Sequence, residues 1–246
     1  MRRLIKATAA ARVAFRALRL LDDAIMPMRC AFCGTRTGHH KKRICCGCFG
    51  DLPWIEDACA QCARPLDIAL PSGVRCASCQ ARPPPFTATI APLRYEFPVD
   101  AGLKALKFSR RLHYAPAFAN LLASYANRLP PAPDALLPVP LHWRRQIFRG
   151  FNQARELSRP IAQCTGLPII DVARRRRATR SQSGLSASER RRNLHGAFTV
   201  SSTAHYSHVI IVDDVVTTGE TTRQLAKALI DSGVKRVSVL AVARAV

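Results

Sequence analysis

Four C-x-x-C pairs constrain the fold of this chain more than any other feature of its sequence. They are Cys30/Cys33, Cys45/Cys48, Cys59/Cys62 and Cys76/Cys79. A C-x-x-C turn directs two thiolates to one point, and two such turns complete the tetrahedral four-sulfur environment that Zn²⁺ prefers. The gaps within successive couples of pairs are 11 and 13 residues, which makes two similar units. The spacing therefore predicts two zinc sites with these eight cysteines as ligands.

The region that carries the pairs, 28–82, is too short to gain much stability from a hydrophobic core. Bound metal would supply most of its folding free energy. Reversible redox thiols and an iron–sulfur cluster are the alternatives. Four thiolates leave no open coordination position, so we expect the zinc to be structural rather than catalytic.

Two further cysteines lie outside the four pairs. Cys46 competes with Cys45, but pairing Cys45 with Cys48 restores the two-residue spacing. Cys164 lies in an apparent helix far from the cluster and is expected to be a buried apolar residue.

The charge of the chain is strongly positive. Among 246 residues, 38 are Lys or Arg and 16 are Asp or Glu, which gives a formal net charge of +22. Such a charge attracts polyanions, so nucleic acid, phosphorylated small molecules and acidic membrane surfaces are candidate partners. Hydrophobic residues make up 48% of the chain, which excludes disorder throughout. No apolar run approaches the roughly 18 to 20 residues of a membrane span.

The first 27 residues predict a basic amphipathic helix, whose apolar side would pack on the rest of the protein. Contact with acidic lipid or nucleic acid is the alternative. Its basic residues are scattered, whereas a secretory signal clusters them before an unbroken apolar stretch. We therefore expect a cytoplasmic location, where clustered cysteines more often bind metal than form disulfides.

The character of the chain changes after the Pro-rich segment Arg82–Phe86. Short apolar runs then occupy 135–139, 209–212 and 237–242, and helical periodicity occupies 101–111, 114–129, 152–163 and 220–232. Strands that alternate with helices predict a parallel α/β sheet flanked by helices. The expected organisation is a helix over 1–27, a double zinc ribbon over 28–82, a Pro-rich linker and first strand over 83–95, and an α/β domain over 96–246.

The segment Val209–Thr222, VIIVDDVVTTGETT, predicts a phosphate site. A buried strand ends in two acids, and a Thr/Gly-rich turn opens a helix whose free amides and dipole favour an anion. Gly219 allows close approach of the backbone. The hydroxyls available to phosphate oxygens are those of Thr217, Thr218, Thr221 and Thr222. Asp213 and Asp214 suit sugar hydroxyls or a bridging Mg²⁺.

This segment resembles the 5-phosphoribosyl-1-pyrophosphate (PRPP) binding signature of the type I phosphoribosyltransferases. The resemblance implies a phosphoribosyltransferase-like sheet, PRPP bound with Mg²⁺, and a catalytic role for Asp213 and Asp214. It also implies that the loop after the first core strand, here 141–145, holds pyrophosphate. Arg144 and Arg145 would bind it, with Arg149 also within reach.

Two further blocks resemble the competence protein F (ComF) family. One is LLPVPLHWRRQIFRGFNQA, Leu136–Ala154, which includes R-G-F-N-Q. The other follows the pattern R-x-T-x-x-Q-x-x-L-x-x-x-x-R-x-x-N, met by Arg177, Thr179, Gln182, Leu185, Arg190 and Asn193. The resemblance implies a role in natural transformation and in handling single-stranded DNA, with a DNA-uptake helicase or processing protein as a partner.

A run of arginines between the two phosphate loops is our candidate for nucleic-acid contact. It comprises Arg174, Arg175, Arg176, Arg177 and Arg180. Such runs are usually solvated, and their contacts with DNA go mainly to phosphates. Trp143, Phe148 and Phe151 lie near basic residues as candidate base-stacking surfaces, although aromatic residues more often pack in a core.

The sequence thus favours a ComF-family protein that binds PRPP or a related phosphoribosyl ligand. The alternative is an active phosphoribosyltransferase, of the glycosyltransferase class, that transfers the phosphoribosyl group to a nitrogen acceptor and releases pyrophosphate. A PRPP-sensing DNA-binding regulator is a third hypothesis. Nothing in the sequence selects an acceptor.

Overall fold

The computed structural model describes residues 28–37, 43–66, 73–126, 129, 132–176, 196–201 and 205–245. The predicted N-terminal helix, Arg177, Arg180 and the rest of the third family block lie outside these residues. The chain divides into two compact units, 1–51 and 52–246.

The described part of the first unit is a small cysteine-rich fold. An antiparallel bridge joins Arg29 to Arg36, and the short helix α2 (Cys46–Gly50) follows. Cys45 is the N-cap of α2, and its sulfur accepts a hydrogen bond from the backbone N–H of Cys48 at 3.4 Å.

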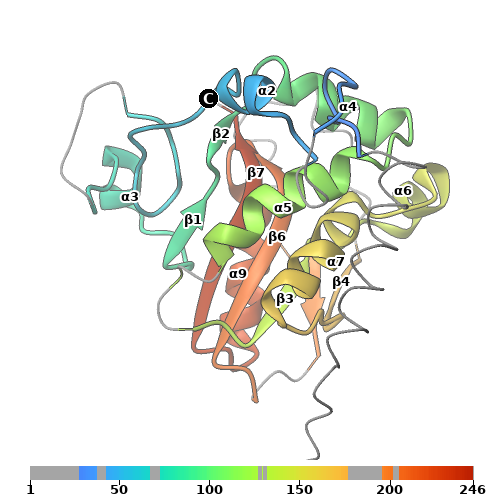
Figure 1. Ribbon diagram of the computed structural model, residues 1–246. Helices are drawn as coiled ribbons and strands as arrows, with labels where there is room; N and C mark the ends of the chain where they lie inside the picture. Colours follow the sequence, from blue (N-terminus) through green and yellow to red (C-terminus); the bar gives the residue numbers. More distant parts are fainter. Residues whose placement is uncertain are drawn as a thin grey trace, which may run out of the picture. The chain divides into compact units, whose positions relative to one another are not determined.

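A parallel sheet forms the centre of the second unit (Figure 1). Its strands are β1 (Ala88–Ile90), β2 (Leu93–Arg94), β3 (Ala135–Pro138), β6 (His208–Val216) and β7 (Arg236–Arg244). The order is β1-β7-β6-β3, and β2 pairs with β7 beyond β1. β6 and β7 pair in parallel from His208 with Arg236 to Val216 with Arg244. The predicted α/β class is confirmed.

Helices cover both faces of this sheet. They are α4 (Val99–Phe108), α5 (Tyr114–Ala126), α6 (Trp143–Arg149), α7 (Gln153–Thr165) and α9 (Glu220–Asp231). In Figure 1, α5 and α7 lie in front of the sheet and α9 lies behind it. Four of these helices correspond to the predicted ones, whereas α6 occupies a segment predicted as a basic turn.

Alternation along the central strands explains the two layers. Val209 and Ile211 of β6 belong to a buried cluster that includes Leu225 and Leu229 of α9. Ile210, between them, is also fully buried. Since successive side chains of a strand point to opposite faces, a run of apolar residues such as this one requires cover on both sides.

The second ribbon belongs to the same unit as the sheet, which differs from the expected division at 82. It contains the short helix α3 (Ala77–Ala81). Trp54 forms a bridge with Leu93 of β2, and Gln61 donates hydrogen bonds to the carbonyls of Pro84 and Phe86 at 3.3 and 3.1 Å. Residues 83–95 supply two strands, so they form part of the sheet.

A two-stranded antiparallel sheet stands apart from the main one in the hydrogen-bond pattern. It consists of β4 (Ala173–Arg175) and β5 (Phe198–Val200), and Arg174 pairs with Thr199. Within the described residues, no helix is long and apolar enough to cross a membrane.

Candidate functional site

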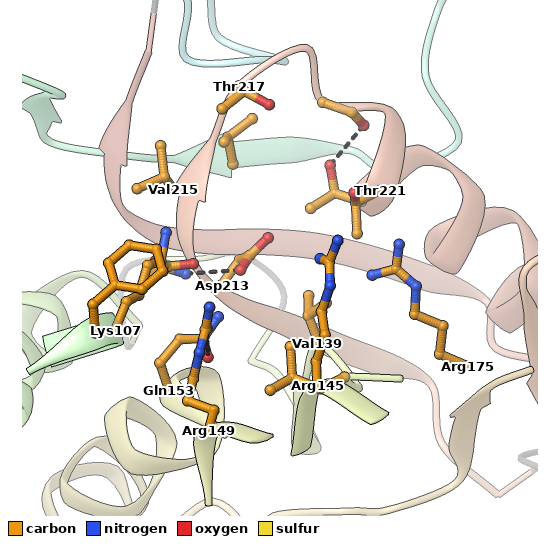
Figure 2. Close-up of a pocket in the computed structure, with 16 residues that line it drawn as sticks. Lys107, Val139, Arg145, Arg149, Gln153, Arg175, Asp213, Val215, Thr217 and Thr221 are labelled. Carbon is orange, nitrogen blue, oxygen red and sulfur yellow. Dashed lines mark hydrogen bonds and ion pairs between the residues drawn. The ribbon is translucent and has the colours of Figure 1, made fainter. Parts of the chain in front are cut away.

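A cavity of about 220 Å³ lies at the carboxyl end of β6 (Figure 2). The loop Thr217–Gly219 follows the strand, and α9 begins at Glu220. Gly219 is the N-cap of α9 and has φ +77°, a conformation that residues with a Cβ rarely adopt. The hydroxyl of Thr222 donates to the carbonyl of Gly219 at 2.8 Å, which fixes the turn.

The two acids of the signature have different environments. Asp214 is 3% exposed and forms an ion pair with Lys107 of α4. Asp213 is half-buried, and its Oδ1 accepts a hydrogen bond from the backbone N–H of Asp214 at 2.9 Å. Burial and the neighbouring Asp214 carboxylate both disfavour the ionised form of Asp213 and hold its pKa well above the ordinary range. Asp213 is therefore the acid that a ligand's hydroxyl or cation can reach.

The pKa of Lys107 moves in the direction that keeps this ion pair charged. Burial by itself would lower the pKa of Lys107, but the Asp214 carboxylate outweighs burial and raises it. Lys107 was not among the predicted site residues. It lies in a helix far from the signature in sequence, so no local pattern places it beside Asp214.

Three arginines line the cavity from two elements. Arg145 and Arg149 come from α6, and Arg175 comes from β4. Figure 2 shows their side chains extending toward the space beside Asp213 and Thr221. Burial lowers the pKa of Arg149 and of Arg175, although a guanidinium stays charged in proteins. With Lys107 the cavity has four cationic and two acidic side chains, so it favours an anion.

Helix α6 occupies much of the segment predicted as a pyrophosphate loop. His142 caps it, since the backbone N–H of Arg144 donates to His142 Nδ1 at 3.3 Å, and Gly150 ends it with φ +79°. The side chain of Arg145 lines the cavity. Arg144 does not, and its guanidinium lies 5.2 Å from the centre of the Trp143 ring.

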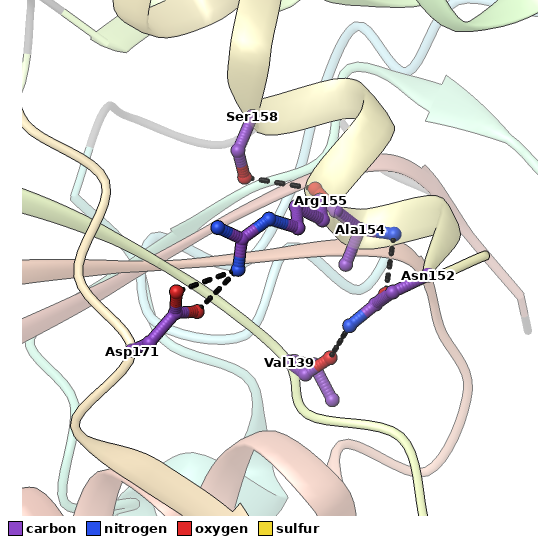
Figure 3. Close-up of polar contacts among 6 residues, drawn as sticks. All are labelled: Val139, Asn152, Ala154, Arg155, Ser158 and Asp171. Carbon is purple, nitrogen blue, oxygen red and sulfur yellow. Dashed lines mark hydrogen bonds and ion pairs between the residues drawn. The ribbon is translucent and has the colours of Figure 1, made fainter. Parts of the chain in front are cut away.

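The R-G-F-N-Q motif builds the support beneath the cavity (Figure 3). Asn152 donates to the carbonyl of Val139 at 3.0 Å and accepts from the N–H of Ala154 at 3.0 Å, which joins the end of β3 to the start of α7. Gln153 lines the cavity and accepts a hydrogen bond from Arg149 at 2.7 Å. Gln153 is a second lining residue that was not predicted.

The remaining phosphate-loop residues divide between two cavities. Thr217, Gly219, Thr221 and Thr222 line the cavity just described. Thr218 lines a second cavity on the other side of the loop, and its hydroxyl accepts from the N–H of Glu220 at 3.4 Å. The structure therefore gathers most, though not all, of the predicted loop residues.

The arginine run does not act as one exposed surface. Arg174 and Arg176 are exposed, but Arg175 is 8% exposed, lines the ligand cavity and lies over the ring of Phe198 at 5.6 Å. The physical reason is that β4 alternates its side chains, so Arg175 points away from its neighbours. Its assignment to nucleic-acid contact is corrected.

Two expectations about burial were wrong. Trp143 and Phe148 of α6 are 58% and 89% exposed, and Ile147 between them is 74% exposed, so this face of the helix is not in the core. Phe151 is partly buried. Cys164 is exposed rather than buried, because it lies on the outer face of the amphipathic helix α7.

The eight predicted cysteines form two clusters of four. One comprises Cys30, Cys33, Cys45 and Cys48, and the other comprises Cys59, Cys62, Cys76 and Cys79. The sulfurs of Cys33 and Cys45 are 3.6 Å apart, and those of Cys62 and Cys76 are 3.7 Å apart. Four sulfurs at the usual Zn–S distance in a tetrahedron are about 3.8 Å apart, so each cluster fits Zn²⁺. Zinc bound there would supply folding free energy.

A parallel sheet with an Asp-Asp-Thr-Gly loop at its edge, joined to two four-cysteine clusters, defines a zinc-ribbon protein with a phosphoribosyltransferase-type domain. The double zinc ribbon domain matches residues 21–82, and the phosphoribosyl transferase domain matches residues 149–245. Competence protein F from Haemophilus influenzae is 30% identical over 227 residues, 88% of this chain and 97% of that protein. The chain belongs to the competence protein F family.

Other relatives have a name that refers to DNA. DNA utilization protein YhgH from Escherichia coli O157:H7 is 36% identical over 207 residues, 82% of this chain and 90% of that protein. A solved glutamine PRPP amidotransferase from B. subtilis aligns with 57% of this chain and 30% of its own, at 19% identity and a TM-score of 0.37. That score is too low to support an argument.

Proposed function

We propose that this protein binds PRPP or a related phosphoribosyl ligand in the cavity at the end of β6. One observation carries the proposal. The half-buried Asp213 lies in a cavity that also contains the amino end of α9 and the cationic side chains of Arg145, Arg149, Arg175 and Lys107. A ligand that suits this arrangement has hydroxyls beside several phosphate groups.

Each part of the ligand has a matching group. The 5-phosphate would accept hydrogen bonds from the loop Thr217–Thr222, at the positive end of the α9 dipole. Asp213 would accept hydrogen bonds from ribose hydroxyls. The diphosphate would face Arg145 and the other arginines, where Mg²⁺ carried with PRPP would neutralise part of its charge.

The same site suits transfer chemistry, and this is the second candidate function. Loss of pyrophosphate from PRPP passes through a sugar cation, so catalysis needs positioning and electrostatic stabilisation more than a protein nucleophile. Lys107 and the arginines would stabilise the charge that develops on the leaving diphosphate. An assay of pyrophosphate release with PRPP, Mg²⁺ and a panel of nitrogen acceptors tests this activity.

We further propose that the protein acts in DNA uptake and handles single-stranded DNA. The names of its relatives support this role, and so does the exposed face of α6. Trp143 and Phe148 offer flat apolar surfaces for bases, and Arg144 lies beside them as a phosphate contact. The exposed Arg174 and Arg176 add positive charge. A helicase or processing protein of the uptake pathway is the partner that this role implies.

Calorimetry with PRPP and Mg²⁺ tests the ligand site. Replacing both Asp213 and Asp214 by Ala should weaken binding by about 1.5 to 3 kcal/mol for each charged hydrogen bond lost. The adjacent arginines of α6 provide a matched pair. Arg145→Ala should weaken PRPP more than ribose 5-phosphate, whereas Arg144→Ala should leave both affinities near wild type. Unchanged affinity in the double Asp variant contradicts the site.

Salt titration tests the DNA proposal. Affinity for single-stranded DNA should fall with salt, with a log–log slope of about −0.7 per phosphate neutralised. The double variant Arg174→Ala/Arg176→Ala should flatten the slope for all sequences alike, since arginine contacts with phosphates carry no base information. Absence of DNA binding at low salt overturns this part of the proposal.

A further inference from the structure

The phosphate loop separates two cavities. The second cavity, of about 90 Å³, lies between the loop and the second ribbon. It is lined by Thr218 of the loop and by Cys62, Cys76 and Cys79 of the second cysteine cluster. Val216 and Gly219 line both cavities. The loop that would hold phosphate on one side therefore forms a wall against the ribbon on the other.

One buried side chain joins the ribbon to this loop. Arg244, the last residue of β7, is 4% exposed. Its Nε donates to the carbonyl of Cys62 at 3.1 Å. Its Nη1 donates to the carbonyl of Val216 at 2.9 Å and also to the carbonyls of Thr217 and Ala245. A single guanidinium thus contacts a cysteine of the second cluster and both residues at the end of β6.

The environment explains why a charged side chain is stable there. The carbonyls at the end of β6 turn away from the regular ladder and need donors, and a guanidinium supplies five N–H groups in a rigid fork. Four thiolates around Zn²⁺ have a net charge of −2, which favours a cation nearby. Removing one partner from such a buried group is costly, because the charge or the carbonyls are left uncompensated.

We propose that Arg244 is a positioning residue that couples metal loading of the second cysteine cluster to the geometry of the phosphate loop. The effect on ligand binding rests on the proposed function. Loading fixes Cys62, Cys62 fixes the guanidinium, and the guanidinium fixes the carbonyls of Val216 and Thr217. The amides and hydroxyls that follow are then set for phosphate. The first cluster belongs to the other compact unit, so it serves as the control.

Coupling between two binding sites is reciprocal. If zinc at the second cluster favours the ligand-binding form of the loop, then PRPP must strengthen zinc binding at that cluster by the same factor. The coupling can therefore be measured from the zinc side, without an enzymatic assay.

Hydrogen exchange tests the coupling without any ligand. The variant Cys30→Ser retains only the second zinc site, and Cys59→Ser retains only the first. Chelation of zinc from Cys30→Ser should raise amide exchange in 216–222 by about tenfold or more, the size of typical coupling. Chelation of zinc from Cys59→Ser should leave exchange in 216–222 unchanged. Equal exchange in loaded and chelated Cys30→Ser overturns the coupling, whether or not PRPP binds.

Ligand binding provides the second test. Arg244→Gln should weaken PRPP about tenfold or more, while Arg223→Gln should change it less than about twofold. Arg223 is a matched control, since it lines the same cavity but donates to the carbonyl of Arg82 instead of the loop. PRPP should also slow chelator-driven zinc release from Cys30→Ser and leave release from Cys59→Ser unchanged.

The outcomes separate the two proposals. No PRPP binding by the wild-type protein overturns the ligand assignment, and the exchange experiment then decides the coupling. PRPP binding that is equal in wild type and Arg244→Gln overturns the role of Arg244. If Arg244→Gln does not fold, zinc release from Cys30→Ser decides, because an equal rate with and without PRPP overturns the coupling.

Discussion

The two zinc ribbons have the same local backbone pattern and different surroundings. Each pattern recurs 29 residues later, from Cys30 to Cys59. Cys30 donates its N–H to Thr35 and Cys59 donates to Arg64, both at 2.8 Å. The bridge of Arg29 with Arg36 corresponds to that of Ala58 with Pro65. This register confirms the internal repeat that the cysteine spacing indicated.

The difference lies in what each ribbon packs on. The first belongs to the compact unit that ends at Asp51. The second shares a core with the sheet, since Ala63 belongs to the same buried cluster as Phe86 and Val237. One metal fold can therefore serve as a small separate unit or as part of a larger domain, and the residues around the cysteines decide which.

The largest expected effect comes from removing zinc on one side of this comparison. Cys59→Ser should destabilise the second unit by more than about 3 kcal/mol, since structural zinc contributes on the order of 10 kcal/mol in small domains. Cys30→Ser should leave the main unfolding transition unchanged. Denaturant unfolding with zinc analysis measures both. Equal transitions in the two variants would show that the second ribbon is independent of the sheet.

A smaller effect should come from the polar link between the second ribbon and β1. Gln61→Ala removes two hydrogen bonds to buried carbonyls and should lower the free energy of unfolding of the second unit by about 1 to 3 kcal/mol. The repeat places Phe32 at the same position of the first ribbon. Phe32→Ala is the control, and an equal loss in the main transition would contradict the assignment.

The turn after the second cysteine provides a matched pair with an effect of about 1 kcal/mol. Gly34 and Ala63 occupy equivalent positions and both have positive φ, +74° and +54°. An added Cβ at Gly34 meets no atom within 4 Å, so Gly34→Ala should cost only backbone strain and weaken first-site zinc affinity about fivefold.

Ala63→Gly should have nearly no effect, because relief of the same strain offsets the loss of a buried methyl group. Competition with a chromogenic chelator measures zinc affinity in both variants. Wild-type affinity in Gly34→Ala would show that the first turn adapts, and the two ribbons would then differ in rigidity as well as in packing.

The smallest effect concerns the phosphate loop and pH. Because the pKa of Asp213 is raised in the folded protein, the folded state holds its proton more tightly than the unfolded state. Stability should fall as pH rises from about 4 through this raised pKa, and Asp213→Asn should remove the fall. The gain at neutral pH should be about 1 kcal/mol or less, since Asp213 is half-exposed.

Denaturant unfolding from pH 4 to 8 checks this prediction. The fall should occur in the transition of the second unit alone, whereas the first unit contains no Asp213 and should show none of it. An Asp213→Asn variant that keeps the wild-type pH dependence would assign the titration to another group.

The sequence by itself determined the features that depend on nearby residues. Cysteine spacing was enough to predict both clusters, because each thiolate pair is fixed by a short turn. The strand, acids and loop of 209–222 were also predictable, since apolar runs, adjacent carboxylates and a Thr/Gly turn are local signals. The order of helices and strands followed from periodicity for the same reason.

Tertiary structure decided which side chains meet. The contact of Lys107 with Asp214 joins segments far apart in the chain, as does that of Arg244 with Cys62. Three consecutive arginines, 174–176, look alike in sequence, yet strand alternation places only Arg175 in the cavity. Sequence patterns specify local backbone, whereas the direction of a side chain and its distant partners depend on how the elements pack.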